Sequence, residues 1–212
     1  DEKKRIPNKI VSVDLDSSYT IKGKSGNYEV EMIHMTHSIP HTAMIALHTP
    51  EGIVVYGNDF KIDNTPILES PPNYNALKRI SKEGIKVAIL DSLYCSSETK
   101  TPSENLARNM VKEIFSDFHG TKNAIFGSTF SSHIARLKSI VEFGKKLDRE
   151  IYFIGRSMNR YMLASHDINL IDFKNQVRIV TYKNQVASAL KKINSHREKY
   201  LVVCTGHQGE PG

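Results

Sequence analysis

The chain has 212 residues, 39% of them hydrophobic and 25% charged, which excludes a disordered tail and predicts a globular protein of one or two domains. Its net charge of +6 fits a polyanionic partner as well as an ordinary basic surface. No stretch reaches the roughly 18 apolar residues of a membrane span, and residues 1–9 lack the apolar core of a signal peptide. From these two absences we expect no membrane association. Cys95 and Cys204 are too few for a disulfide framework, so we also expect a reducing compartment, the cytoplasm.

The first 65 residues predict antiparallel β-structure. Their apolar runs predict strands over residues 9–15, 28–35, 44–49 and 52–57. The last two strands flank Pro50-Glu51-Gly52 and form a predicted hairpin. A proline-rich loop, residues 63–75, then leads to a short helix near residues 74–82. His37 follows one of these strands and Asp59 follows another, so two metal-competent side chains come at strand ends.

From residue 85 onward, short apolar runs alternate with amphipathic segments. Strands are predicted over residues 86–90, 123–128, 150–155, 177–182 and 200–206, and helices over residues 102–118, 133–147 and 183–193. This alternation predicts an α/β fold with a parallel sheet and right-handed crossovers. The unbroken apolar run at 86–90 predicts a strand covered on both faces. Thr101 is predicted to cap the helix over residues 102–118, and Glu104 is predicted to reach back to the start of that helix. The apolar side chains of the helix are predicted to face the core.

Polar residues follow several of these predicted strands. Asp91, Ser128, Arg156 and His207 each come at a carboxyl end, where ligands bind in open α/β sheets. The strand-to-helix turn from Ser128 to His133 is rich in hydroxyls and is a candidate phosphate cradle. Ordinary helix capping by Thr129 or Ser131 explains the same residues.

The metal-competent residues allow two interpretations. His34, His37 and His41 are spaced for a trio, but residues three apart on a strand point to opposite faces, so we discount this arrangement. His37 with Asp59 is the better pair, because a carboxylate can bridge two metal ions and an imidazole can hold one of them. A structural histidine and a turn carboxylate are the alternative.

Five motifs, in order, carry a resemblance to a known family. Residues 36–67, THSIPHTAMIALHTPEGIVVYGNDFKIDNTPI, resemble the THSIPD…ALHTPEG…TGDFKFDQTP segment of the ribonuclease J family, metallo-β-lactamase nucleases with an inserted β-CASP domain. ILDSLYCSSETKTPSE is similar to SDSTNAE…TPSE, FGSTFSSHIARLKSIV to TFASNIHRIQQVI, IYFIGRSMNR to the GRSM turn, and VVCTGHQGEPG to TTGSQGEPM. The likeness extends from about residue 29 to residue 212.

The resemblance implies a division into two domains. Residues 1–94 would be the second part of a metallo-β-lactamase αββα sandwich, and residues 95–212 a β-CASP α/β domain with a mainly parallel sheet. It also implies that the chain is an internal segment of an archaeal-type member.

The resemblance assigns roles to single residues. His37 matches a zinc ligand and Asp59 the aspartate that bridges two zinc ions, with manganese or magnesium as alternative ions. Asp91 matches the carboxylate of motif A and His133 the histidine of motif B, which lies against the scissile phosphate. The RNA backbone would be bound by Ser128, Ser131, Ser132, Arg136 and Arg156.

The resemblance implies zinc-dependent hydrolysis of RNA in the 5′ to 3′ direction, with a preference for a 5′ monophosphate. It implies endonucleolytic cleavage as a further activity and a homodimer as the assembly. Two other classes remain open. One is a metal-free RNA-binding or scaffolding protein, and the other is a β-CASP nuclease that acts on DNA ends or in messenger 3′ processing.

Several positions depart from the family pattern. Asn58 stands where the family often has Gly, Leu93 replaces a Thr and His41 replaces an Asp. The H-x-H-x-D-H motif and the motif C histidine are absent from these 212 residues. We therefore expect the chain to supply two metal ligands and to be inactive by itself.

Overall fold

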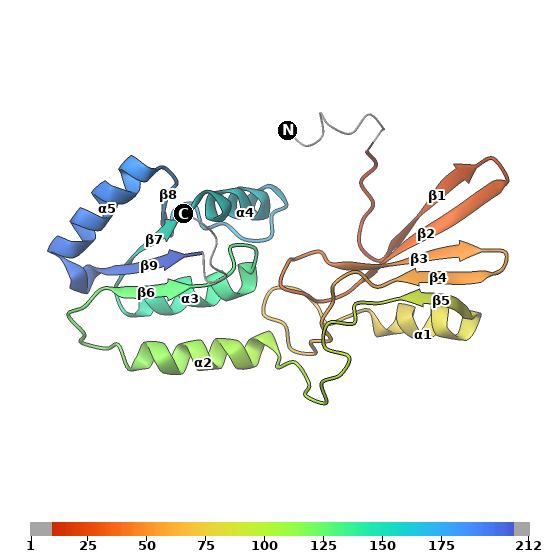
Figure 1. Cartoon of the computed structure of the whole chain (residues 1–212), viewed down its shortest axis with the longest axis horizontal. Helices are drawn as coiled ribbons and strands as arrows, with labels where there is room; N and C mark the ends of the chain where they lie inside the picture. The colour runs from red at the N-terminus through yellow and green to blue at the C-terminus, as the bar shows by residue number, and fades with distance from the viewer. Residues whose placement is uncertain (1–9, 206–212) are drawn as a thin grey trace. The chain divides into compact units, whose positions relative to one another are not determined.

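A computed structural model describes residues 10–205, which divide into two compact units (Figure 1). The first unit contains the described residues up to 37 together with 41–64 and 70–101, and the second contains 38–40, 65–69 and the described residues from 102 onward. Each unit has a sheet of its own. Among the described residues, no helix has the length and apolar character needed to cross a membrane.

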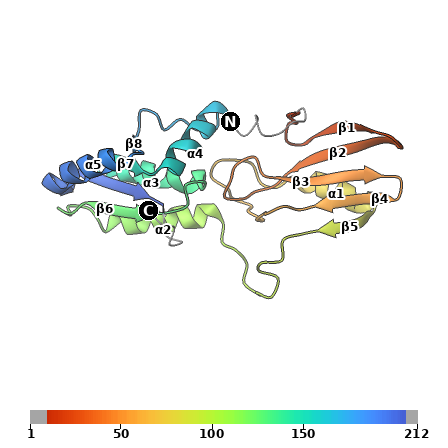
Figure 2. The same cartoon turned by 45° about the horizontal axis from the view of Figure 1, so that its top comes forward.

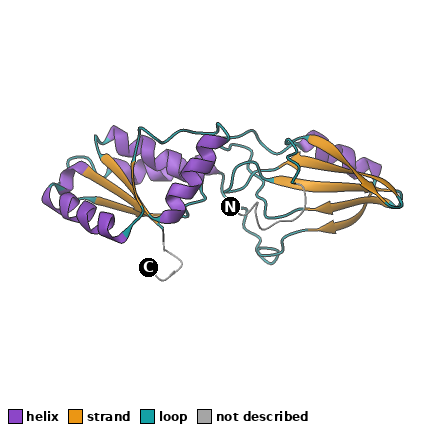
Figure 3. Ribbon diagram, turned by 90° about the horizontal axis from the view of Figure 1, so that it is seen from above, coloured by secondary structure: helices purple, strands orange, loops and turns teal. Residues whose placement is uncertain are grey.

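The first unit is a five-stranded sheet with one helix. Its strands, in spatial order, are β1 (Ser17–Gly23), β2 (Gly26–His34), β3 (Ala43–Thr49), β4 (Gly52–Tyr56) and β5 (Ile85–Ile89) (Figure 2). Neighbours from β1 to β4 are antiparallel, which confirms the predicted hairpin, and β5 pairs parallel with β4. Helix α1 (Tyr74–Glu83) packs on this sheet, where Ile80 joins Ile33 and Val55 in a buried cluster (Figure 3).

Two predictions for this sheet are wrong. Residues 10–15 do not form a strand, and β1 begins only at Ser17. Asp16 breaks the extended run because its φ is 57° and its Oδ1 accepts a hydrogen bond from the backbone N–H of His34 (2.8 Å). The predicted strand at 86–90 is observed as β5, but all five of its residues are exposed, so it is not covered on both faces, and it lies at the edge of the described sheet. It also belongs to the first sheet rather than to the parallel sheet that follows.

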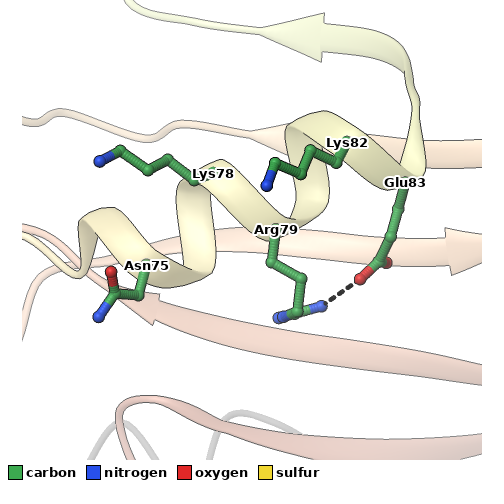
Figure 4. A pocket seen from close by; sticks show the side chains of 5 residues that line it. All are labelled: Asn75, Lys78, Arg79, Lys82 and Glu83. Carbon is green, nitrogen blue, oxygen red and sulfur yellow. Dashed lines mark hydrogen bonds and ion pairs between the residues drawn. The ribbon is translucent and has the colours of Figure 1, made fainter.

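A network of charges fastens α1 to the sheet. Arg79 donates to Glu83 Oε1 (2.8 Å) and to Glu31 of β2, which also lies 3.2 Å from Nε2 of His48 on β3. The hydrogen bond to Glu31, followed by the one to Glu83, raises the pKa of Arg79. In Figure 4, Arg79 and Glu83 point to one side of the helix. A surface hollow of about 450 Å³ lies here, lined by Asn75, Lys78, Arg79, Lys82 and Glu83, and all five residues belong to α1.

The second unit has a parallel sheet with the strand order β6-β9-β7-β8. The strands are β6 (Ile125–Ser128), β7 (Glu150–Ile154), β8 (Arg178–Val180) and β9 (Tyr200–Cys204). The helices are α2 (Glu104–Ser116), α3 (Ile134–Lys146), α4 (Arg156–Asp167) and α5 (Lys183–Ser195). The predicted alternation and the predicted parallel sheet are therefore confirmed, and α4 is a helix that the sequence patterns did not single out.

Apolar clusters lie on both faces of this sheet, and Figure 3 shows helices on either side of it. Phe153 packs with α3 and α4, whereas the adjacent Tyr152 packs with α5. Helix α3 approaches closely at Gly144, where an added Cβ would lie 2.5 Å from Leu201 Cδ2. Glycine at this position therefore sets the spacing between α3 and the sheet.

Helix α2 differs from prediction in two ways. Its N-cap is Ser103, whose side chain accepts from the N–H of Leu106 (3.2 Å), rather than Thr101. Phe115 is buried, but Leu106, Met110 and Ile114 are about half exposed, so only part of the apolar stripe faces the core. Arg108 fixes the helix to α3 through Glu142 (2.6 and 2.7 Å), and this hydrogen bond lowers the pKa of Glu142.

Candidate functional site

The hydroxyl of Thr36 joins the two segments that carry the predicted metal ligands. Thr36 forms an isolated bridge with Lys61, whose backbone N–H donates to Thr36 O (2.7 Å). Thr36 Oγ1 donates to Lys61 O and accepts from the N–H of Asp63 (3.1 Å). His37 follows directly in the sequence, and Asp59 lies two residues before Lys61. The buried threonine therefore holds the His37 segment against the loop that contains Asp59.

The donor chemistry of this pair fits a metal ion in part. A half-buried imidazole, His37, and an exposed carboxylate, Asp59, are ligand types that zinc accepts. Within residues 10–205, no three His, Cys, Asp or Glu side chains gather into a group that could hold a metal. His34 is buried and its Nε2 lies 3.0 Å from Ser70 O, which gives this histidine a structural role. A complete site would need ligands from outside the described residues.

Backbone conformation explains two departures from the family pattern. Asn58 has φ 51° and His41 has φ 59°, both in the left-handed region. Gly adopts this region without strain, and Asn, Asp and His enter it more readily than other residues. Asn in place of Gly, and His in place of Asp, therefore preserve the turns on either side of the candidate ligands.

We expect Asn58→Ala to lower the free energy of unfolding by about 1 kcal/mol, because a β-carbon without a compensating polar group is strained at positive φ. Asn58→Gly should leave stability within about 0.5 kcal/mol of the original. Urea denaturation of the three proteins measures this difference. Equal stability of the Ala and Gly variants would contradict the conformational explanation.

Asp91 lies in the first unit, after β5. Its exposed carboxylate accepts from the N–H of Leu93 (3.0 Å). It lines a pocket of about 490 Å³ together with Phe60, Lys61, Ile62, Tyr94, Cys95, Lys100 and Thr101. Because β5 pairs with β4, the expectation that Asp91 shares a sheet edge with Ser128 and Arg156 is wrong.

Ser128 and Arg156 do share the carboxyl edge of the parallel sheet. Ser128 ends β6 and Arg156 begins α4 directly after β7, and both strands run parallel to β9 between them. Both residues are exposed. In the turn that follows β6, Ser131 is buried and Ser132 is half-buried. His207, predicted at the same edge, lies outside the described residues.

Three helices begin at this edge without a side-chain cap. Helix α3 starts after His133, α4 after Gly155 and α5 after Tyr182, and none of these residues makes a capping hydrogen bond through its side chain. By contrast, Asn73 caps α1 and Ser103 caps α2. The capping alternative for Thr129 and Ser131 is therefore not observed. The partial positive charge of the helix starts favours an anionic group at this edge.

Glu104 is the residue that sequence analysis assigned only to helix capping. Its side chain is buried and accepts two hydrogen bonds from Arg136, from Nε (2.8 Å) and from Nη2 (3.1 Å). It also lies 3.4 Å from Nε2 of His133. The start of α2 thus brings two predicted site residues, Arg136 of α3 and His133 just before it, to one buried carboxylate. The TPSE string contains this glutamate, but its spacing from Arg136 gave no signal of the contact.

The family model and the similar proteins that match this chain all belong to one family. Residues 122–212 match the family model of the ribonuclease J beta-CASP domain. Ribonuclease J of Pyrococcus abyssi is 41% identical over 188 residues, which are 89% of this chain and 42% of that protein. Ribonuclease J of Methanocaldococcus jannaschii is 42% identical over 187 residues, 88% of this chain and 42% of that protein. The chain thus spans less than half the length of these archaeal relatives.

More distant proteins share the pattern. Ribonuclease J of Helicobacter pylori is 31% identical over 185 residues, 87% of this chain and 25% of that protein. A crystal structure of a protein of unknown function from Enterococcus faecalis has a TM-score of 0.53 at 12% identity, and the match covers 96% of this chain and 58% of that one. At that identity the likeness concerns the fold alone. The parallel α/β unit, the motifs in their order and the archaeal matches lead to one conclusion: the chain belongs to the ribonuclease J family.

Proposed function

We propose that this chain forms part of a metal-dependent ribonuclease that hydrolyses RNA phosphodiesters from 5′ to 3′. Residues 1–94 would belong to the metallo-β-lactamase domain and residues 95–212 to the β-CASP domain. The observation that carries the proposal is the Thr36 junction, since it holds the His37 segment against the Asp59 loop. The relatives named ribonuclease J support RNA as the substrate.

His37 and Asp59 would hold zinc, with two ions in the complete site and manganese or magnesium as alternative ions. Zinc, when bound, would supply Lewis-acid activation of the attacking water. The exposed Asp59 carboxylate has two oxygens and can serve as a bridging ligand. The hydrogen bond from Asp63 to Thr36 holds the loop that contains Asp59. Less conformational entropy of this loop would therefore be lost when a metal ion binds.

The carboxyl edge of the parallel sheet would bind the RNA backbone. Ser128, Ser132 and Arg156 reach the surface there and would contact phosphate oxygens, while the buried Ser131 would support the turn. His133 would donate a proton to the leaving oxygen or hold a phosphate oxygen, and Arg136, held by Glu104, would add positive charge. We propose Asp91 as a further catalytic residue. We further propose that the enzyme prefers RNA with a 5′ monophosphate and can also cleave RNA endonucleolytically. Its assembly would be a homodimer and its location the cytoplasm.

Asp59→Asn tests the metal assignment in the protein expressed from its complete gene. We expect zinc affinity to fall at least about tenfold and degradation of 5′-monophosphorylated RNA to fall with it, because the amide is neutral and a poor bridging ligand. Elemental analysis and an RNA degradation assay measure the two effects. Asp117→Asn, at the exposed end of α2, is the matched control. Unchanged zinc content in Asp59→Asn would refute the assignment.

The same material separates the other classes of function. Salt-dependent RNA binding with no cleavage after addition of zinc or manganese would favour a scaffolding protein. Preferred cleavage of DNA ends, or of messenger 3′ ends, would favour another β-CASP nuclease. Degradation that begins at the 5′ monophosphate supports the proposal.

A further inference from the structure

The pocket beside Asp91 has aromatic and apolar walls. Phe60 and Ile62 come from the loop after β4, and Tyr94 from the loop after β5. The Tyr94 side chain is 72% exposed, so its ring is accessible to a ligand. All residues that line the pocket belong to the first unit. Its volume of about 490 Å³ is within the usual range of about 300–1,000 Å³ for small-molecule sites.

Two charged side chains of the pocket are available to a ligand. Asp91 and Lys100 are both exposed, and neither forms an ion pair with a residue of the described part of the chain. Lys61, by contrast, lies 3.5 Å from Asp63 and is already paired. Asp91 uses Oδ1 for the N–H of Leu93, and its carboxylate can accept a further hydrogen bond from a donor on the ligand. The pocket therefore offers an aromatic face, an acceptor and a cation.

A nucleotide carries the groups that match these three features. Bases of single-stranded RNA stack on tyrosine rings, the exocyclic amino groups of bases donate to carboxylates, and phosphates attract lysine. The SDSTNAE string of the ribonuclease J family that this chain resembles has Asn where Tyr94 stands, so the aromatic ring is a departure from that string. We propose that the pocket is a base-binding subsite for single-stranded RNA, in which one base stacks on Tyr94 and Lys100 contacts the adjoining phosphate. This inference rests on the proposed function, because it supposes that RNA reaches Asp91.

Tyr94→Trp provides a direct probe when its fluorescence is compared with that of the original protein, because residues 1–212 contain no tryptophan. In the full-length protein, we expect single-stranded RNA to quench the fluorescence of the new indole, and an abasic oligonucleotide of equal length and charge to leave it unchanged. Tyr94→Ala should weaken RNA binding about tenfold, whereas Tyr94→Phe should retain it. Tyr19→Ala, at a tyrosine of β1 that is 42% exposed, is the matched control and should bind as the original protein does.

The outcomes distinguish this inference from the proposed function. If RNA binds and is degraded normally, but the indole responds equally to abasic and to base-containing strands, the subsite is refuted and the nuclease proposal stands. Equal affinity of Tyr94→Ala and the original protein also refutes the subsite. If the original protein neither binds nor degrades RNA, both proposals fail. Base-dependent quenching together with weaker binding of Tyr94→Ala supports the subsite.

Discussion

Replacing Arg149 with methionine should destabilise the second unit by about 3–5 kcal/mol, the largest effect we expect from a single substitution in this chain. Arg149 is 8% exposed. Its Nη1 donates to the carbonyls of Asn123 (3.0 Å) and Arg197 (3.2 Å), and its Nη2 to that of Thr121 (2.7 Å). Burial lowers the pKa of the guanidinium. The side chain thus joins the segments that precede β6, β7 and β9, and methionine would leave three carbonyls without these donors.

Urea denaturation and amide hydrogen exchange of the β9 residues measure the effect of Arg149→Met, because β9 lies at the centre of the second sheet. The exchange measurement assigns the loss to the second unit even if the two units unfold separately. Arg160→Met is the matched control: Arg160 is exposed on α4, and its loss should change stability by no more than about 0.5 kcal/mol. Similar effects at the two positions would show that the three carbonyl contacts contribute little.

Glu104→Ala should destabilise the second unit by about 2–4 kcal/mol, because it leaves the partly buried guanidinium of Arg136 without its countercharge. Arg136 and His133 are both partly buried beside this carboxylate, with side chains 29% and 17% exposed. Without Glu104, the two side chains lose the group that holds them together at the start of α3. We therefore expect Glu104→Ala to weaken the RNA binding proposed above as well as to lower stability. Glu104→Gln retains a hydrogen-bond acceptor without the charge, so its stability should lie between that of the original protein and that of Glu104→Ala.

A double-mutant cycle isolates this contact. In an Arg136→Met background, Glu104→Ala should cost less, with a coupling energy of about 1–3 kcal/mol. Glu113→Ala, at an exposed position of the same helix, controls for the loss of a carboxylate from α2. Additive effects of the Glu104 and Arg136 substitutions would contradict the ionic cluster.

The sequence predicted most of the elements but not their partners. The period of the apolar residues located β6, α3, β7 and α5, because each of these elements has a buried face in one chain segment. The same period could not tell that β5 pairs with β4, since a short apolar run fits either sheet. The exposed half of α2 was unpredictable for the same reason, as periodicity gives the apolar face of a helix and not what covers it.

The residues of the candidate site could be predicted only where they belong to a short string of consecutive residues. The HSIP and NDFK strings indicated His37 and Asp59 through family resemblance, and the turn residues Asn58 and His41 were visible as departures. The role of Thr36 was not, because its hydroxyl meets a carbonyl 25 residues away. The contact of Glu104 with Arg136 spans 32 residues. Such pairs depend on the packing of two elements, which no local pattern contains.

The edge position of β5 has a consequence for the behaviour of the molecule in solution. Ile85, Val87 and Ile89 are 42%, 46% and 52% exposed, and within residues 10–205 the strand pairs with β4 alone. An apolar strand with an open side and no proline accepts strands from other molecules. A sample with this edge uncovered should therefore become turbid as concentration or temperature rises. A lysine in place of Val87 would oppose such association.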